Sequence, residues 1–569
     1  MKERAKGKPR EKAVASNGKS LWLVLFVIAM AVSIIVMDLT IVDVSMPAMM
    51  TDLHLSFASV EWVVDLYSLV FASLLITFGR IADHIGRKKM MIIGLAVFVA
   101  GSIVAALAPS LAPLLIGRFI QGVGGAMILP TTLSSINTIF KGKYRIMAFA
   151  TYGSSIAVAA GVAPLIGGLF TTYSTWRWVF WFDVIVAGVV GLLVWYAIPD
   201  TFGEKIKGMF DFGGFVLSTL AFVFIVYGLI EGQNYGWWFP KSGTKPWAAG
   251  LSRIPWVFLA GIVAVILFVV LEIILENRGK STLMSVKLFK YRSFSFGNIV
   301  SIVNAVGEYG LVFLLPLFLQ NILRLSAIQT GYVLCVMASG AFLSGGFATP
   351  FVKHTNAKTV ISTGFLFEAG SMAGFFFTIR PGNGAIEGLI YLWLALYGVG
   401  LGFASAQLTS VIMIDVPDLK AGQGSSVKST ISQLASSLAI AVIGIIFVDF
   451  LWATLPPKVN QLHLPDQFSR EINNVVIDSS GSAIPELEES KEYLEAPASF
   501  QKTFKDKINS GFTEGISNTL GVDSLILLGG GVISWILPNE KKRKKAKESE
   551  KESEAIETVK AEAGTAISL

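Results

Sequence analysis

The sequence has few of the residues on which soluble enzymes and secreted domains depend. Only 15% of its 569 residues are charged and 53% are hydrophobic, whereas soluble domains carry roughly 25% charged residues. Cys335 is the only cysteine, which excludes an intrachain disulfide and a site built from several thiolates. The four histidines are scattered and show no metal-ligand spacing. These shortages indicate an integral membrane protein without a metal site.

The chain also lacks a phosphate-binding loop. The stretch "SNGKS" at 16–20 resembles the end of such a loop, but Ala13 stands where the first glycine is required and no strand precedes it. No Ser/His/Asp set and no His/Glu metal spacing lies within the apolar runs. We therefore expect no enzyme activity and no cofactor, with a driving force other than ATP hydrolysis.

Long apolar runs dominate the rest of the chain. A helix needs about 20 apolar residues to cross the hydrocarbon core of a membrane. The first run is too long for a signal peptide and lacks a cleavage site, so it is expected to remain as a span. Fourteen spans are predicted, at 21–46, 57–79, 88–107, 111–136, 146–170, 177–198, 211–232, 254–276, 294–319, 328–350, 357–379, 386–410, 424–453 and 516–538.

The basic residues predict the orientation of these spans. The net charge of +7 is distributed over short connections rather than over one soluble face, which argues against nucleic acid as a partner. Cytoplasmic loops of membrane proteins carry an excess of Lys and Arg, and both termini are therefore expected in the cytoplasm, with an even number of spans. The basic connections are the N-terminal tail, 86–89, 141–145, Lys205 with Lys207, 278–292, Lys353 with Lys358, Lys420 and 541–545.

Two longer segments lie outside the predicted spans. Residues 454–515 connect the last two spans on the outer side and include the amphipathic stretch "FQKTFKDKINSGF"; a lid or a structural hairpin is expected there. The Lys/Glu/Ala-rich tail at 539–569 is expected to be a solvated disordered or fraying helical end.

The turn between spans two and three carries the most specific motif. Residues 79–91 read "GRIADHIGRKKMM", and an ordinary basic loop would explain the cations but not the Gly-x-x-x-Asp-x-x-Gly-Arg spacing. This stretch resembles the signature of the major facilitator superfamily. The resemblance implies that Gly79, Asp83, Gly86 and Arg87 brace the helix ends on the cytoplasmic side in the outward-facing state.

Span four contains "GRFIQGVGGAM", with Arg118 in mid-helix. A charged side chain there costs at least ~2.5–3.5 kcal/mol on insertion scales, and arginine cannot lose its proton to avoid this cost. Arg118 therefore needs an anionic partner or water, unless it extends to an interface. Arg118, Gln121 and Gly122 resemble the span-four motif that the superfamily associates with proton coupling.

Span five reads "GSSIAVAAGVAPLIGG". Small residues allow helices to pack backbone against backbone, and a proline bends a helix, so a general packing face is one interpretation. Gly161, Pro164, Gly167 and Gly168 also resemble the antiporter motif found in exporters of this superfamily, although Ala163 replaces the usual glycine before the proline.

Two aspartates interrupt the first span in "MDLTIVDVSMP", a stretch that resembles the first span of fourteen-span drug:proton antiporters. Five helical positions separate Asp38 from Asp43 by about 140°, so they face different directions; Asp38 lies deeper and is favoured as functional. Asp65 lies in "WVVDLYSL" of span two, and this stretch resembles the same segment of QacA-type multidrug exporters.

Acids also interrupt later spans. Glu308 lies in span nine and Glu368 in span eleven. Transporters of this kind are built from repeated halves, so span nine corresponds to span one, and Asp38 and Glu308 are expected to face a central cavity from related positions. For each of these acids, the alternative is an interfacial or hydrogen-bonded residue without a transport role.

Several aromatic residues lie near these acids. The aromatic rings of Trp62, Tyr67, Tyr309 and Phe313 are candidates for cation–π contact with a substrate. Aromatic residues at such positions also serve simply as packing residues.

The resemblance implies an all-α integral membrane protein with the major facilitator fold and fourteen transmembrane helices. It predicts two six-helix bundles with two helices inserted between them. The expected divisions are a basic tail at 1–20, an N-terminal bundle at 21–198, inserted helices at 211–276, a C-terminal bundle at 294–538 and a charged tail at 539–569.

The function implied is the export of lipophilic, cationic drugs or antiseptics in exchange for protons, by alternating access. The expected partners are a small lipophilic molecule, protons and membrane lipid, and the protein is expected to be a monomer in a bacterial plasma membrane. One alternative is an exporter of an endogenous lipid, peptide or anionic metabolite. Another is a membrane sensor that uses the transporter fold without transport.

Overall fold

The protein folds into membrane-length helices. The computed structural model describes residues 20–140, 142–202, 211–241, 245–280, 282–379, 387–416 and 421–538. Every element of secondary structure in these ranges is helical. A bilayer offers no water to backbone N–H and C=O groups, so long apolar segments satisfy them within helices. The expected all-α membrane fold is confirmed.

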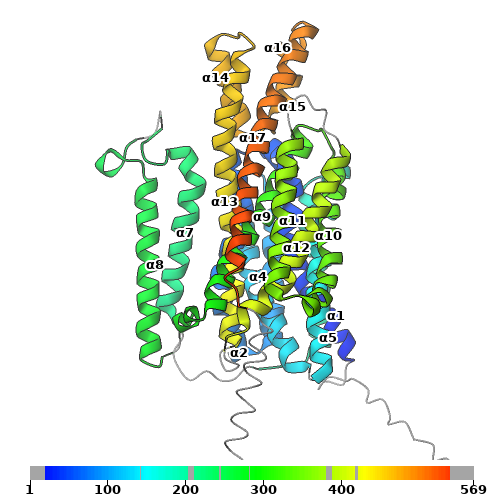
Figure 1. The fold of residues 1–569 in the computed structure, drawn as a ribbon, viewed down its shortest axis with the longest axis vertical. Helices are drawn as coiled ribbons and strands as arrows, with labels where there is room; N and C mark the ends of the chain where they lie inside the picture. The colour runs from blue at the N-terminus through cyan, green and yellow to red at the C-terminus, as the bar shows by residue number, and fades with distance from the viewer. Residues whose placement is uncertain are drawn as a thin grey trace, which may run out of the picture.

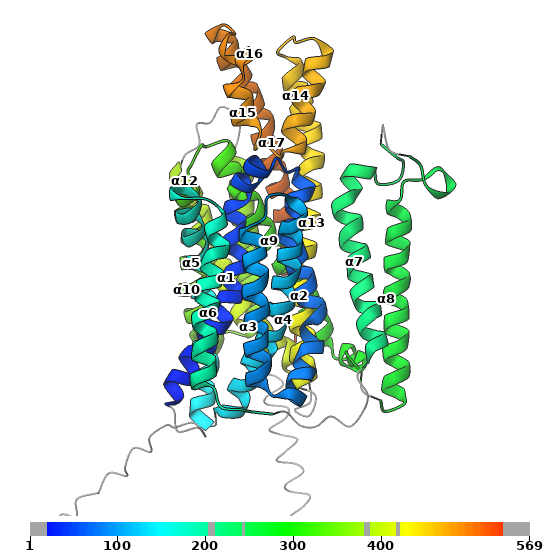
Figure 2. The same ribbon diagram turned by 180° about the vertical axis from the view of Figure 1, so that it is seen from behind.

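Six helices form the N-terminal bundle (Figure 2). In it α1 packs on α5 and α6, α3 packs on α4 and α6, and α2 packs on α4. The helices are α1 (Leu21–Leu53), α2 (Phe57–Ile85), α3 (Arg87–Ala106), α4 (Leu111–Ile139), α5 (Gly142–Tyr173) and α6 (Arg177–Ala197).

Six further helices form the C-terminal bundle, in which α17 packs on α9, α11 and α13. The two bundles meet where α5 packs on α10 and where α2 packs on α13, and α1 also contacts α9. Each of the first two contacts joins the second helix of one bundle to the fifth helix of the other, as repeated halves require. The helices are α9 (Arg292–Asn321), α10 (Ala327–His354), α11 (Ala357–Thr378), α12 (Glu387–Met413), α13 (Ala421–Asn460) and α17 (Ala498–Ser534).

The inserted helices α7 (Phe212–Tyr235) and α8 (Ile254–Asn277) form an antiparallel pair at one side of the bundles (Figure 1). The carboxyl of Asp211 caps α7 by accepting a hydrogen bond from the Gly214 backbone N–H, 2.8 Å away. α7 contacts α2 and α13, and α8 packs on α7. Two short 3₁₀ helices, η1 (Ala248–Gly250) and η2 (Val286–Lys290), flank α8.

The fourteen long helices occupy the fourteen predicted runs. Thirteen of them are long and apolar enough to cross a membrane in their described residues. The remaining helix, α5, contributes the shorter apolar stretch Val158–Tyr173 in its described part.

The segment predicted to be an outer loop differs most from expectation, because much of it is helical. α13 continues to Asn460, and α14 (Asp466–Asp478), α15 (Ile484–Glu489) and α16 (Lys491–Leu494) follow before α17 begins at Ala498. Figure 1 shows these elements projecting beyond one end of the bundles. We call this the hairpin end, and the opposite end, where Arg87 begins α3, the basic end.

The reason for the early start of α17 is its apolar spacing. Phe504, Ile508 and Phe512 recur every fourth residue and are all buried, so one face of the helix packs while charged residues cover the other. The hydroxyl of Thr454 on α13 donates to the Gly511 carbonyl over 2.8 Å. A search for long apolar runs misses this amphipathic extension and places the helix start at 516.

Candidate functional site

A buried ion pair lies inside the N-terminal bundle. Asp38 of α1 is 0% exposed and Arg118 of α4 is 1% exposed. Arg118 Nη1 lies 3.0 Å from Asp38 Oδ1 and 2.9 Å from Asp38 Oδ2. A buried guanidinium requires an anion beside it. The two residues were separate candidates in the sequence, and the structure brings them together.

Two further contacts position the Arg118 side chain. Its Nε donates to the Val63 carbonyl of α2 over 2.9 Å, and its guanidinium carbon lies 4.6 Å from the centre of the Tyr67 ring. Tyr67 in turn stacks on Phe71 at 5.9 Å between ring centres. Arg118 is therefore fixed by α2 as well as by Asp38.

Gln121, one turn along α4, connects this pair to α3. Its amide nitrogen donates to Asp38 Oδ1 over 3.2 Å and to the Ser102 hydroxyl over 2.9 Å. Its amide oxygen accepts a hydrogen bond from Arg118 over 3.1 Å. The carboxylate of Asp38 thus receives hydrogen bonds from two side chains of α4, and α3 orients one of them.

Asp183 of α6 extends this network, and sequence reasoning did not single it out. It is 0% exposed, and its carboxyl interacts with Asp38 and Gln121. Neither of its oxygens makes a hydrogen bond of normal geometry in the described part of the chain. Asp38 binds the guanidinium directly, and the Asp183 carboxyl interacts with it electrostatically. The available signal was an acid within the apolar run "VFWFDVIVAG" at 179–188.

Asp43 and Asp65 form a second buried group. They are 3% and 0% exposed, and they interact with each other electrostatically. Asp43 also interacts with Arg118 at longer range. Both oxygens of Asp65 and one of Asp43 lack a hydrogen-bond partner among the described residues. In the described part of the chain Asp43 does not join the hydrogen-bonded network of Asp38. The carboxyls of Asp38 and Asp43 point in different directions from α1, as their spacing predicts.

The C-terminal bundle holds its own charged pair. Glu308 of α9 is partly accessible and interacts electrostatically with Lys428 of α13, which is also partly accessible. Lys428 was not singled out from the sequence, although it is a cation inside the predicted span 424–453. Both side chains are therefore more accessible than Asp38 and Arg118 of the N-terminal bundle.

Glu368 of α11 lies deeper in the same bundle. It is 0% exposed, and Asp523 of α17 is 1% exposed. Glu368 interacts with both Glu308 and Asp523, and Tyr397 of α12 interacts with all three acids. Neither oxygen of Glu368 has a hydrogen-bond partner in the described ranges.

The charged groups of the two bundles correspond by helix order. The first helix of each bundle carries an acid, Asp38 or Glu308, and the sixth carries a buried aspartate, Asp183 or Asp523. The bundles differ on their fourth helices, where α4 supplies Arg118 and α12 supplies Tyr397. The N-terminal group therefore contains a permanent cation, and the C-terminal group has its cation on α13.

The four candidate aromatic residues are divided among different places. Tyr67 lies under Arg118, and Tyr309 is partly accessible beside Glu308 on α9. Phe313 is fully buried and contacts Phe57 at 5.4 Å between ring centres. Trp62 faces α7, where its indole nitrogen donates to Glu231 over 3.0 Å.

The signature motif joins helix ends at the basic end. Gly86 has φ +102°, a conformation that glycine adopts without strain, and it separates α2 from α3. Arg87 donates to the Ser134 carbonyl of α4 over 2.9 Å and to the Thr138 hydroxyl. A Cβ added at Gly79 would stand 3.2 Å from Pro130 Cβ. The side chain of Asp83 lies outside the described residues.

The small residues of α5 allow close contact with two helices. A Cβ at Gly167 would stand 2.6 Å from the Ile41 carbonyl oxygen of α1, and one at Gly168 would stand 2.4 Å from the Ala327 carbonyl oxygen of α10. Gly161 faces Ala338, and the carbonyl of Pro164 faces Gly331, in the same contact with α10. The motif therefore packs α5 against both α1 and α10, which belong to different bundles.

The two bundles are closed against each other at the hairpin end. In the described part of the chain, hydrogen bonds join them at four places. Gln320 Nε2 donates to the Val44 carbonyl over 2.9 Å, and Ile328 N donates to Thr172 Oγ1 over 2.9 Å. Cys335 Sγ donates to the Gly161 carbonyl over 2.9 Å, and Ser482 Oγ donates to Met50 Sδ over 3.8 Å.

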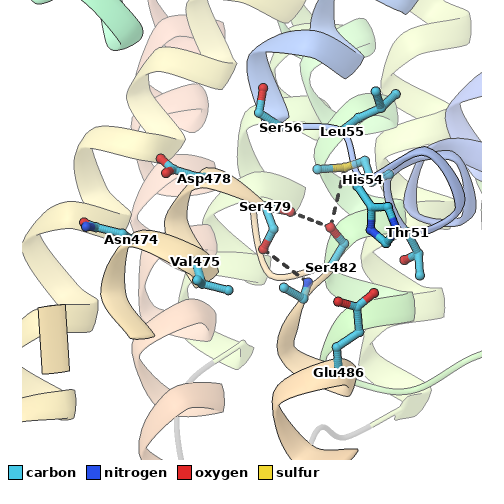
Figure 3. A pocket seen from close by; sticks show the side chains of 12 residues that line it. Thr51, His54, Leu55, Ser56, Asn474, Val475, Asp478, Ser479, Ser482 and Glu486 are labelled. Carbon is cyan, nitrogen blue, oxygen red and sulfur yellow. Dashed lines mark hydrogen bonds between the residues drawn. The ribbon is translucent and has the colours of Figure 1, made fainter. Parts of the chain in front are cut away.

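A pocket of about 340 Å³ lies on this closed end, between the α1–α2 turn and α14–α15. Figure 3 shows His54, at the end of α1, and Glu486 of α15 directed into it from opposite sides. Burial raises the pKa of Asp478, which also lines the pocket, and the Lys241 ammonium partly opposes this shift. The pocket belongs to the contact between the bundles, because its walls come from both.

Residues 21–440 match the model of the Major Facilitator Superfamily, and the chain belongs to this superfamily of membrane transporters. It is 26% identical over 516 residues to the tetracenomycin C resistance and export protein of Streptomyces glaucescens, covering 90% of this chain and 91% of the relative. It is 27% identical over 514 residues to the multidrug efflux pump LfrA of Mycolicibacterium smegmatis, covering 90% and 95% of the two chains.

A solved structure supports the fold. The crystal structure of a bacterial homolog of the human lysosomal transporter Spinster, in an inward-facing and occupied conformation, matches with a TM-score of 0.59. The match covers 90% of this chain and 96% of that chain at 15% identity. The predicted resemblance to the superfamily is confirmed.

Proposed function

We propose that this protein exports lipophilic cationic drugs from the cytoplasm or the inner leaflet in exchange for protons. The observation that carries the proposal is the buried group of Asp38, Asp183 and Arg118, in which Asp38 binds the guanidinium and the Asp183 carboxyl interacts electrostatically with both. Two acids beside one cation leave one negative charge unbalanced, and a proton or a cationic substrate balances it. The names of the two relatives, an antibiotic exporter and a multidrug efflux pump, agree with this class of cargo.

The exchange follows from the hydrogen bonds of Asp38. A proton on Asp38 removes the charge that holds Arg118 Nη1 and Gln121 Nε2, so α1 is released from α4. Loss of that proton restores the bonds and leaves the group of Asp38, Asp183 and Arg118 more negative, which favours entry of a cation. The site then holds either a proton or cargo. Exchange of one proton for one monovalent cation moves no net charge, so the pH gradient, about 1.4 kcal/mol per pH unit, drives accumulation.

The same proposal fixes orientation. Basic connections mark the cytoplasmic side, so the hairpin end faces outward and both termini lie in the cytoplasm. The membrane is then a bacterial plasma membrane. With this orientation, closure of the bundles at the hairpin end is the arrangement that an inward-facing state requires. One chain supplies both bundles and their charged groups, so a monomer suffices for transport.

Lys428 favours a second candidate, an exporter of an anionic metabolite, peptide or lipid. Its ammonium is partly accessible and its charged neighbour Glu308 becomes neutral on protonation, which would leave a cation facing the substrate. Arg118 does not favour this candidate, since it is bound to Asp38. The charge of the transported compound therefore distinguishes the two.

Purified protein in liposomes with an acidic lumen provides the test. We expect accumulation of ethidium, a lipophilic cation, with simultaneous loss of lumenal protons measured by a trapped pH dye. A panel of neutral and anionic dyes of similar size is tested in parallel. Accumulation of the anionic dyes alone would favour the second candidate, and movement of neither dye nor protons would favour a non-transporting sensor.

A further inference from the structure

Glu61 of α2 is a buried acid that the exchange described above does not use. It is 0% exposed, and neither carboxyl oxygen has a hydrogen-bond partner in the described part of the chain. It lies on the helix that contacts α13, where the two bundles meet. An isolated ionised carboxyl without partners is costly in such a place.

The carboxyl of Glu61 occupies space that only a glycine leaves free on the opposite helix. A Cβ added at Gly444 of α13 would stand 1.9 Å from Glu61 Oε1 and 3.3 Å from a ring carbon of Phe57. The carboxyl therefore lies directly against the α13 backbone. This contact joins the two bundles near the hairpin end, so separation of α2 from α13 there would break it.

Aromatic rings separate Glu61 from water at the hairpin end. Phe57, one turn above Glu61 on α2, contacts Phe313 at 5.4 Å and Phe447 at 6.0 Å between ring centres. Phe447 also contacts Phe512 of α17 at 5.4 Å. The residues just before Phe57, Leu55 and Ser56, line the pocket in Figure 3. We call this set of rings and the Glu61–Gly444 contact the hairpin-end gate.

Within the described part of the chain, the charged groups that interact with Glu61 include no cation. The charged neighbours that interact with it are two acids, Asp65 on its own helix and Glu231 on α7. On α4, Arg118 is bound to Asp38. The charged residues of α13 in the described ranges have other partners: Lys428 interacts with Glu308, Asp449 with Lys241, and Lys458 with Glu514.

We propose that Glu61 binds a proton from the outer medium when the hairpin-end gate closes and releases it when the gate opens. The inference rests on the proposed function only in placing the hairpin end outside. A neutral carboxyl fits against the backbone of Gly444, whereas an ionised one requires water and separates α2 from α13. Low external pH thus favours the closed gate, and high external pH favours the open one.

This proton differs from the one exchanged at Asp38. Glu61 is covered when the protein faces inward, so its proton returns to the side from which it came and crosses no membrane. Glu61 therefore sets how external pH controls the gate, without adding to the number of protons exchanged per drug. One linked proton changes the open-to-closed ratio by up to about tenfold per pH unit.

The test is a distance measurement across the gate in lipid nanodiscs. Spin labels are placed by Leu107→Cys and Gly388→Cys, both at exposed positions, in a Cys335→Ser background. Double electron–electron resonance at pH 5 and pH 8 then gives the open fraction without substrate. We expect the open fraction to rise with pH in the parent protein and to stay low at both pH values in Glu61→Gln.

Two control variants distinguish protonation from packing. Glu231→Gln alters a neighbouring acid that already binds Trp62, and it should retain the parental pH response. Gly444→Ala adds the Cβ that meets the Glu61 carboxyl and should raise the open fraction at both pH values. The double variant Glu61→Ala/Gly444→Ala removes this steric conflict and should lower the open fraction again.

An unchanged pH response in Glu61→Gln, or no pH response in the parent, overturns the inference. Asp38→Asn in the labelled background separates it from the proposed function, because the gate should still respond to pH through Glu61. If the parent exchanges no drug for protons in liposomes while the Glu61-dependent distance change persists, the exchange proposal fails and the gate inference stands.

Discussion

Arg118 Nη1 lies within 3.0 Å of both oxygens of Asp38, although neither side chain reaches solvent. A buried ion pair contributes little to stability relative to an apolar pair, but removing one partner alone is strongly destabilising. A role in transport, in which Asp38 alternates between binding Arg118 and binding a proton, therefore explains the pair better than a contribution to stability does. Asp183 brings a second buried carboxyl that interacts electrostatically with this pair, and a proton or a cation would balance its charge.

Removal of Arg118 alone should lower the free energy of unfolding more than removal of both Arg118 and Asp38. Arg118→Ala leaves Asp38 buried without its cation, and we expect a loss of about 3–5 kcal/mol in the free energy of unfolding. The double variant Asp38→Ala/Arg118→Ala should recover part of that loss. Denaturant unfolding of the purified proteins measures these losses and that of Asp38→Ala. A double-variant loss equal to the sum of the two single losses would show that the pair is not coupled.

Asp183→Asn should weaken the exchange without removing the ion pair. The asparagine keeps the shape but cannot share a proton with Asp38, so we expect slower proton-driven uptake of ethidium and a narrower pH range of activity. Asp523→Asn, at the corresponding place on α17, provides the matched comparison in the other bundle. Parental pH dependence in Asp183→Asn would remove Asp183 from the exchange site.

Gly168→Val should prevent closure at the hairpin end. The added side chain meets the Ala327 carbonyl, which lies 2.4 Å from the position of a Cβ at Gly168, and overpacking typically costs about 1–3 kcal/mol. The closed state should lose population by about tenfold, measured as faster maleimide alkylation of Cys335 in the α5–α10 contact. Gly188→Val, with open space around its Cβ position, should alkylate at the parental rate.

Glu308→Gln should weaken the pH dependence of cation binding. Protonation of Glu308 competes with a cation at this partly accessible acid, so equilibrium binding of a cationic dye should strengthen with rising pH in the parent and strengthen less in the variant. Lys428→Met serves as the control, because it removes the neighbouring cation but leaves the titrating acid. A variant that keeps the parental pH profile shows that Glu308 is not a coupled group.

The sequence was sufficient for the helices but not for the contacts between them. Apolar runs and alternating basic loops gave the positions of all fourteen long helices, because each follows from local composition. The amphipathic start of α17 was missed, since Phe504, Ile508 and Phe512 contribute only one apolar face.

The same limit applies to the candidate site. Asp38 and Arg118 each stood out as charges in apolar spans, but their pairing depends on the packing of α1 against α4. Asp183, Asp523, Lys428 and Glu61 carried the same signal and were not selected, because a single sequence does not show which helix faces a given residue.

The most direct test of the exchange mechanism is proton-driven uptake of ethidium by the Asp38→Asn variant in liposomes with an acidic lumen. We predict that the variant folds, shown by an unchanged elution volume, with a lower melting temperature because Arg118 loses its buried anion, and that it accumulates no ethidium and releases no protons. Accumulation at the parental rate, with protons still exchanged, would contradict the central role of Asp38.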